Sequence, residues 1–321
     1  MTDFLRTLGI ELPVVQAGMG GGIATHELAA AVSDAGGLGT IGLVAPGAFR
    51  DEIALARELT EKPVAANVIV PLARWGHWKA AGEADVLVTH WGRRPRRRTR
   101  GLWIHQCGSV QEARAAHAGG ADAVIAQGVE AGGHVRAELP ALELLERIRR
   151  ELPDGYPVLL AGGVADRSDV EAALEAGAVA AVAGTRFLMT DESRAHNEYK
   201  ARLREARATV LTELFGIGWP APHRVIPNKA TERWLAEHPR GPRMLRAFNR
   251  VTAPVLSRTP GALQGRFAAA QRPGRPFFSP APPAEGAPSS LVEAGPLYAG
   301  ETVARIDDVR PARRAVADLT P

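Results

Sequence analysis

The stretch Ala123-Val124-Ile125-Ala126-Gln127-Gly128-Val129-Glu130-Ala131-Gly132-Gly133-His134 joins an apolar run to a glycine-rich segment and a histidine. The apolar run predicts a buried strand, because short apolar runs bounded by turn residues are typical of parallel strands covered on both faces. Two adjacent glycines allow the backbone to approach a ligand closely. In a barrel of alternating strands and helices, catalytic groups lie just beyond the carboxyl ends of strands. His134 is therefore a candidate catalytic residue, with a solvated loop histidine as the alternative.

Seven further apolar runs occur along the chain, and helical patterns separate most of them. The eight predicted strands are 13–19, 37–42, 63–70, 84–89, 102–107, 123–128, 157–163 and 178–187. The predicted helices between them are 25–35, a segment that ends near 61, 109–118, 139–151 and 168–176. Ser109 is expected to cap its helix, with Glu112 at the capping-box spacing. This order predicts an α/β fold, a (β/α)8 TIM barrel, with a doubly wound open sheet as the alternative.

The connections after the third and fourth predicted strands are short, and the fourth carries six arginines between residues 93 and 100. Pro95 and Gly101 mark that segment as a loop, and it has no helical periodicity. No aromatic residues alternate with its arginines, and no nucleic-acid-binding fold surrounds it. We expect a solvated basic loop and no nucleic-acid partner, with a contact to a phosphorylated substrate as a minor alternative.

The composition restricts the class of protein. A net charge of +4 is small for 321 residues, and the single cysteine, Cys107, excludes an internal disulfide and a cysteine-rich metal site. The nine histidines are scattered, so no metal site is expected. The chain has neither an apolar signal segment nor a run approaching the roughly 18 apolar residues of a membrane span. These features predict a soluble cytoplasmic protein without a membrane partner.

The character of the chain changes after Phe187. Residues 191–215 look helical and charged, residues 219–290 carry many prolines and arginines, and 276–290 is expected to be extended. A last helix is expected over 310–319, and if it completes the barrel, the preceding insertion is a candidate lid over the barrel mouth. The predicted domains are a barrel (1–190), an inserted, mainly helical substrate or lid region (191–290) and a return segment with the final barrel helix (291–321).

Two glycine-containing turns follow the seventh and eighth predicted strands, Ala161-Gly162-Gly163-Val164 and Ala183-Gly184-Thr185. Glycines expose backbone N–H groups without side-chain obstruction, and a following helix start favours an anion. In barrels of this type the loops after these two strands commonly bind phosphate. The turns therefore predict a phosphate site, with simple tight turns as the alternative.

The first loop, Gly18-Met19-Gly20-Gly21-Gly22-Ile23-Ala24-Thr25, superficially resembles a dinucleotide-binding fingerprint. It lacks the third glycine at the required spacing, and no acidic residue ends the second strand. At a barrel mouth, such a loop instead allows a flat ring system to lie against the backbone. Asn67 and Gln127, within and at the end of their strands, are candidates to bond the polar edge of that ring, or equally structural amides.

Together these pieces resemble the nitronate monooxygenase family, formerly called 2-nitropropane dioxygenases, which is FMN-dependent and built on a (β/α)8 barrel. The resemblance covers about residues 10–218 and resumes at Leu297-Tyr298-Ala299-Gly300-Glu301. Its matching pieces are Gln16-Ala17-Gly18-Met19-Gly20, Ala66-Asn67-Val68, the stretch from Gln127 to His134, and the two turns after strands seven and eight. Related FMN-dependent enoyl-carrier-protein reductases share much of this pattern.

The resemblance implies a role for each matching position. It implies that Gly18 and Met19 line the flavin ring, that Asn67, Gln127 and Gly132 contact the flavin, and that His134 is the catalytic histidine. It implies that Gly163 and Val182-Ala183-Gly184-Thr185 cradle the phosphate, beside Gly162 of the same turn. The short third and fourth connections and the proline-rich region 250–290 depart from the commonest family pattern, and substrate specificity would be set there.

The expected activity is FMN-dependent oxidation of alkyl nitronates, or of nitroalkanes, with molecular oxygen and with His134 as acid or base. The alternative within the same class is an NAD(P)H-dependent flavin reductase that acts on an enoyl thioester or a quinone. Two further alternatives are a flavin-free phosphate-sugar lyase or isomerase and a flavin-binding accessory protein. The sequence leaves the oligomeric state open, with a homodimer as one candidate.

Overall fold

The computed structural model describes residues 2–92, 101–257, 266, 268–276 and 278–321. The chain divides into two compact units. We call the first the barrel unit; it comprises Met1–Glu130, Arg136–Arg194 and Val309–Pro321. We call the other the second unit; it comprises Ala131–Val135 and Ala195–Asp308. The chain therefore enters the second unit twice, first for only five residues.

The barrel unit contains an eight-stranded parallel sheet, in the order β1-β9-β8-β6-β5-β4-β3-β2. A parallel bridge between Val15 and Leu38 joins the two ends of this order and closes the barrel. The predicted (β/α)8 barrel is thus confirmed, and the open doubly wound sheet is wrong. The strands are β1 (Val14–Gln16), β2 (Gly39–Ile41), β3 (Val64–Ile69), β4 (Val86–His90), β5 (Leu102–Cys107), β6 (Ala123–Gln127), β8 (Val158–Ala161) and β9 (Ala181–Ala183).

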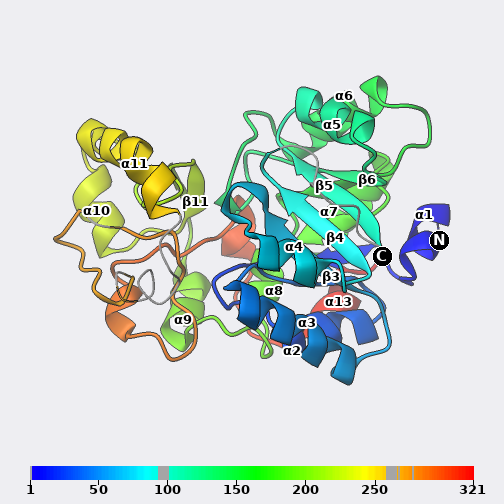
Figure 1. The fold of residues 1–321 in the computed structure, drawn as a ribbon, viewed down its shortest axis with the longest axis horizontal. Helices are drawn as coiled ribbons and strands as arrows, with labels where there is room; N and C mark the ends of the chain where they lie inside the picture. The colour runs from blue at the N-terminus through cyan, green and yellow to red at the C-terminus, as the bar shows by residue number, and fades with distance from the viewer. Residues whose placement is uncertain (1, 93–100, 258–265, 267, 277) are drawn as a thin grey trace. The chain divides into compact units, whose positions relative to one another are not determined.

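Helices surround these strands, and both chain ends belong to the barrel unit (Figure 1). The final helix, α13, packs against α2 and α7, between the first and last helices of the ring. The helical elements are α1 (Asp3–Leu8), α2 (His26–Asp34), α3 (Pro46–Leu59), η1 (Val70–Leu72), α4 (Trp75–Ala81), α5 (Val110–Ala118), α6 (Ala141–Glu151), α7 (Arg167–Glu175), α8 (Thr185–Leu188) and α13 (Ala312–Leu319). Within the described residues, no helix is long and apolar enough to cross a membrane.

The strands form because their side chains are apolar on both faces. One face fills the barrel interior with branched side chains such as Val86, Ile104 and Leu159, and Leu5 and Leu8 of α1 pack against the same cluster. Each fully buried aliphatic side chain of this kind contributes about 1.5–3 kcal/mol relative to an exposed one. A core built in this way holds the strand ends, and therefore the loops that follow them, at fixed positions.

Two local expectations need correction, and a third is not tested. The eighth strand was predicted over 178–187, but β9 ends at Ala183 and the next residues form helix α8, because Gly184 leaves the extended conformation. Ser109 caps α5 as predicted, but the Glu112 carboxylate accepts from the N–H of Gly108 instead of completing a capping box. The third connection contains helix α4, and the predicted arginine loop (93–100) lies outside the described residues.

The second unit is built on a three-stranded antiparallel sheet in the order β10-β11-β7. Its core contains Leu214, Phe215, Val225 and Phe278. The predicted helix over 191–215 is wrong over most of that range, because helix forms only in α9 and the segment then turns into a strand. The elements are β7 (Gly133–His134), α9 (Asn197–Glu205), β10 (Val210–Thr212), β11 (His223–Val225), α10 (Lys229–Leu235), α11 (Arg243–Leu256), η2 (Ser289–Leu291) and η3 (Glu301–Arg305).

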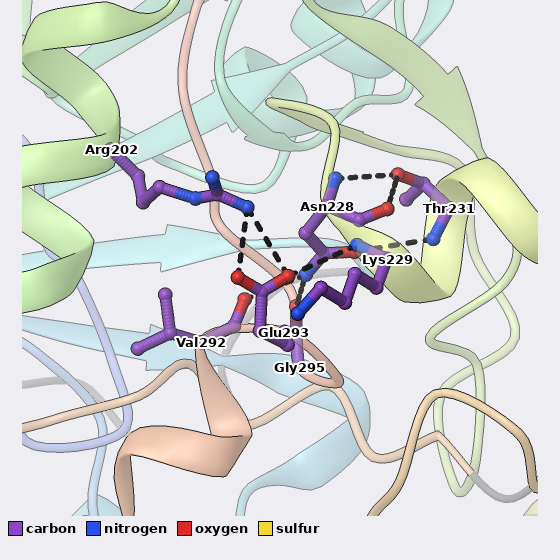
Figure 2. A network of polar contacts seen from close by, with 7 residues as sticks. All are labelled: Arg202, Asn228, Lys229, Thr231, Val292, Glu293 and Gly295. Atoms are coloured by element: carbon purple, nitrogen blue, oxygen red, sulfur yellow. Dashed lines mark hydrogen bonds and ion pairs between the residues drawn. The ribbon is translucent and has the colours of Figure 1, made fainter.

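A polar network ties the proline-rich part of the second unit to its helices (Figure 2). The Asn228 side chain accepts from the N–H of Thr231 and donates to the carbonyls of Val292 and Gly295. Glu293 accepts two bonds from the Arg202 guanidinium. These contacts fix the path of the irregular segment 292–295. This segment leads to Tyr298, which forms an antiparallel bridge with Val225 of β11.

Candidate active site

The predicted flavin-ring residues of the barrel unit lie along the carboxyl ends of its strands. Gly18 and Met19 follow β1, Asn67 lies inside β3, and Gln127 ends β6. The structure brings Gly18 against Asn67, because a Cβ on Gly18 would lie 2.6 Å from Cγ of Asn67. Gly18 is therefore needed for the first loop to approach this strand, and the Asn67 side chain is buried beneath the loop.

The predicted phosphate residues follow the neighbouring strands β8 and β9. Gly162 and Gly163 have φ values of 112° and 76°, which favour glycine. Gly184 differs, because its φ is −106° and an added Cβ would meet only Cβ of Ala17, at an ordinary 3.7 Å. Neither backbone strain nor packing in the barrel unit therefore requires glycine at 184. Val182 and Ala183 end β9, and Thr185 begins α8.

A layer of polar side chains occupies the ends of β4, β5 and β6. His90 pairs with Gln106 across the two strands, and their Nε2 atoms are 3.2 Å apart. The His90 ring also interacts with the side chain of Gln127. Burial holds the pKa of His90 well below its ordinary value, with smaller lowering contributions from His105 and Arg136. His90 is thus a neutral neighbour of the Gln127 amide, which the sequence did not indicate.

His105 is also neutral, and it lies on the opposite face of β5 from Gln106. Burial, with a smaller contribution from Arg136, lowers its pKa to about 4. Its Nδ1 lies 2.6 Å from the hydroxyl of Thr89, which also accepts from the indole N–H of Trp103. These bonds make His105 part of the buried barrel, not a general acid or base at neutral pH.

Trp91, directly after β4, is the one described non-glycine residue with a positive φ, at 60°. The Arg136 guanidinium lies 4.6 Å from the centre of its ring and forms an ion pair with Glu112. Strained backbone of this kind persists only where surrounding contacts hold it. The barrel unit therefore presents a fixed cation and an indole beside the β4 end.

His134 lies in the second unit. It pairs with His223 across β7 and β11, and the next residue, Val135, donates its N–H to the carbonyl of Pro222 at 2.9 Å. Its ring stacks on Trp219, with centroids 3.5 Å apart and planes only 14° from parallel. The residue is 9% exposed, so it is not the solvated loop histidine that the sequence left open.

Two further rings complete this aromatic surround, with centroids 5.2 Å (His223) and 5.5 Å (Tyr298) from that of His134. Nδ1 of His223 donates to the carbonyl of Ala221, while Nε2 accepts from the N–H of Phe215. Burial lowers the pKa of His223 to about 4, so this ring is neutral and its tautomer is defined. The Tyr298 hydroxyl donates to a backbone carbonyl at 2.7 Å.

The sequence did not single out Trp219, His223 or Tyr298 as site residues. Tyr298 lay within a matching segment, but Trp219 had no local signal beyond its residue type. The neighbouring Gly132 has a packing role, because its Cβ would lie 2.6 Å from the backbone of Ala299 and of Gly300. Its contact with a flavin stays a prediction.

A family model described as "Nitronate monooxygenase" matches residues 2–93 and 95–321. The chain belongs to the nitronate monooxygenase family. It is therefore an oxidoreductase, and its family is flavin-dependent in general. The described residues of this family member contain no group of three or more His, Cys, Asp or Glu side chains that could hold a metal ion.

Curated relatives of this chain carry two kinds of name. A nitronate monooxygenase from Pseudomonas aeruginosa is 35% identical over 271 residues, covering 66% of this chain and 77% of that protein. A (3aS,4S,5R,7aS)-5-hydroxy-7a-methyl-1-oxo-octahydro-1H-indene-4-carboxyl-CoA dehydrogenase from Mycobacterium tuberculosis is 33% identical over 247 residues, covering 72% of this chain and 68% of that protein.

Two solved structures are similar to this chain over nearly its full length. FabK from Thermotoga maritima has a TM-score of 0.77 at 30% identity, covering 99% of this chain and 94% of that one. Nitroalkane oxidase from Streptomyces ansochromogenes has a TM-score of 0.74 at 29% identity, covering 98% of this chain and 96% of that one.

Proposed function

We propose that this family member binds FMN and oxidises alkyl nitronates with molecular oxygen. The observation that carries the proposal is the buried His134, held against Trp219 at the end of a glycine loop that starts from β6, in a chain matched over nearly its full length by the nitronate monooxygenase model. The Streptomyces relative, named a nitroalkane oxidase, supports the same substrate class.

The residues present fit a flavin phosphate. Gly184 carries no side chain although neither its φ nor its packing requires glycine, which is expected where ligand atoms occupy the space. The exposed backbone N–H groups of such turns are suitable donors to an anion. The proposed phosphate residues are Gly162, Gly163, Val182, Ala183, Gly184 and Thr185, and the proposed ring contacts are Gly18, Met19, Asn67, Gln127 and Gly132.

When bound, FMN supplies the redox chemistry by accepting the electron pair that the nitronate gives up. The residues of the chain hold the reactants and move a proton. Neutral His134 takes the α-proton of a nitroalkane. Pairing of a protonated ring with nitro or nitronate oxygens is the alternative role. An aromatic surround excludes water from the ring, so the proton transfer does not compete with solvent.

The test is an anaerobic stopped-flow experiment on the purified protein, mixed separately with propyl-2-nitronate and with NADH. We expect the nitronate, and not NADH, to bleach the flavin absorbance, and air to restore it. Bleaching by NADH alone would overturn the proposal.

A second activity is favoured by the Mycobacterium relative, whose name specifies a carboxyl-CoA substrate. A dehydrogenase removes electrons from its thioester; in the reverse, reductive direction NAD(P)H would reduce the flavin, which would then reduce an enoyl thioester or a quinone. Re-oxidation of the NADH-reduced protein by an enoyl-CoA, faster than by air, would identify this activity.

Because the chain is an oxidoreductase, the lyase and accessory-protein alternatives are set aside. A cytoplasmic location and a homodimer stay predictions, and light scattering after size exclusion tests the latter.

A further inference from the structure

The second unit gives His134 a rigid environment. Its backbone is fixed by pairing with β11, and one face of its imidazole is covered by Trp219 at a centroid distance of 3.5 Å. Trp219 is itself only 9% exposed. Its backbone N–H donates to the carbonyl of Gly216, and its own carbonyl accepts from the N–H of Ala221. The indole is thus held in place independently of any substrate.

The other rings near His134 do not offer the same support. His223 is tilted by 54° and Tyr298 by 49° relative to the imidazole, and both centroids lie more than 5 Å away. His223 is neutral because burial lowers its pKa, and both of its ring nitrogens are occupied by backbone bonds. Among the rings that the structure describes here, Trp219 alone stacks on the imidazole.

We infer that Trp219 is a positioning residue for proton transfer: it orients the His134 imidazole by stacking and stabilises the imidazolium that forms during catalysis. This inference rests on the proposed function, in which His134 is the base. The indole face is the strongest cation-binding face among protein side chains, and an attraction of this kind acts on the charged ring more than on the neutral one.

The supported step is proton abstraction from a neutral nitroalkane. The α C–H bond breaks, its electron pair stays on the substrate as the nitronate, and the proton forms a new N–H bond on His134. A substrate supplied already as the nitronate skips this step. Loss of the stack should therefore slow nitroalkane turnover and leave nitronate turnover nearly unchanged.

The experiment compares kcat/KM for nitroethane and for ethylnitronate in the FMN-loaded full-length protein and in Trp219→Leu. From the usual strength of cation–π contacts, we expect the nitroalkane-to-nitronate ratio to fall about 10-fold. Trp219→Phe keeps a stacking ring and should recover most of the ratio. A purely structural role of Trp219 would instead lower kcat/KM for both substrates by the same factor.

Trp234→Leu is the matched control. Trp234 belongs to the core of the same unit, donates its indole N–H to the carbonyl of Pro273, and packs edge-on against Phe278. Its removal should lower the thermal midpoint without changing the nitroalkane-to-nitronate ratio.

A second experiment tests the inference if Trp219→Leu does not fold. Replacement of all tryptophans by fluorinated analogues weakens the ring quadrupole while keeping its shape.

Each outcome decides the question. An unchanged ratio in folded Trp219→Leu, or an equal loss on both substrates, overturns the positioning role. With fluorinated tryptophans, a ratio that does not fall overturns the cation-stabilising part. His134→Ala separates a failure of the proposed function from a failure of this inference. If that variant keeps full nitroalkane turnover, His134 is not the base. If His134→Ala loses most nitroalkane turnover while the substrate ratio of Trp219→Leu is unchanged, only the role of Trp219 is refuted.

Discussion

Gly184→Ala should stabilise the protein and weaken its cofactor binding at the same time. The φ of Gly184 is accessible to alanine, and the new Cβ would meet only Cβ of Ala17 at 3.7 Å. A glycine-to-alanine change at a compatible position stabilises a protein by about 0.4–1 kcal/mol through the unfolded chain. For a unit of this size, that corresponds to a rise of about 1–4 °C in the Tm of the apoprotein.

The effect on FMN has the opposite sign. If the phosphate lies against this bare backbone, the methyl group displaces it and weakens a hydrogen bond to a charged group, which is worth about 1.5–3 kcal/mol. The Kd for FMN should therefore rise about 10- to 100-fold. Quenching of FMN fluorescence during titration of the apoprotein measures this change, and differential scanning calorimetry measures the stability.

Gly47→Ala is the control, because Gly47 lies in helix α3 with nothing within 4 Å of its added Cβ. It should stabilise by about 0.4–1 kcal/mol through the unfolded chain and leave FMN affinity unchanged. An unchanged FMN Kd in Gly184→Ala would refute the assignment of this turn to the phosphate. A fall in apoprotein stability in Gly184→Ala would refute the conclusion that the site has room for a Cβ.

Three further predictions concern other parts of the chain. His134→Ala should retain FMN but lose about 100-fold or more in kcat/KM for nitroethane, because general-base catalysis contributes about 10²–10⁴; unchanged nitroethane kinetics would eliminate the base role. Glu213→Ala should lower the free energy of unfolding by about 2–3 kcal/mol, because its carboxylate is 5% exposed and forms ion pairs with Arg246 and Arg250. The pair with Arg250 contributes less, since that guanidinium is largely exposed to solvent. Urea unfolding that matches the wild type would contradict this prediction. Burial lowers the pKa of His223 from 6.5 to about 4, so the unfolded chain takes up a proton first and stability should fall as pH drops from about 6.5 to 4; urea midpoints that stay flat over this range, or a His223→Gln variant with an undiminished decline, would argue against it.

Much of the barrel was predictable because its signal is local. Runs such as Ala123–Gln127 and Val158–Ala161 are mostly apolar on both faces, because barrel strands pack against helices on one face and against the barrel interior on the other. The eighth strand was overextended because the apolar residues Phe187 and Leu188 follow β9 closely, although Thr185–Leu188 adopts helix after Gly184. Periodicity cannot separate a short buried helix from a strand.

The second unit was less predictable for the same reason. Its strands have two or three residues each, too few for an alternating pattern, and β10 was hidden in a charged stretch that looked helical. The pairing of β7 with β11 also joins segments far apart in the chain, and a two-residue strand is too short to specify that register through a hydrophobic pattern.

The residue order by itself determined where the chain must carry glycine and where it must bury strands. Glycine at 162 and 163 permits the positive φ values that this turn adopts, but the surrounding structure selects them, since Gly184 takes a φ of −106°. Only the tertiary structure decided which ring lies on His134. Trp219 reaches it through the pairing of β7 with β11, a long-range contact whose stability depends on closing the intervening chain around a common core.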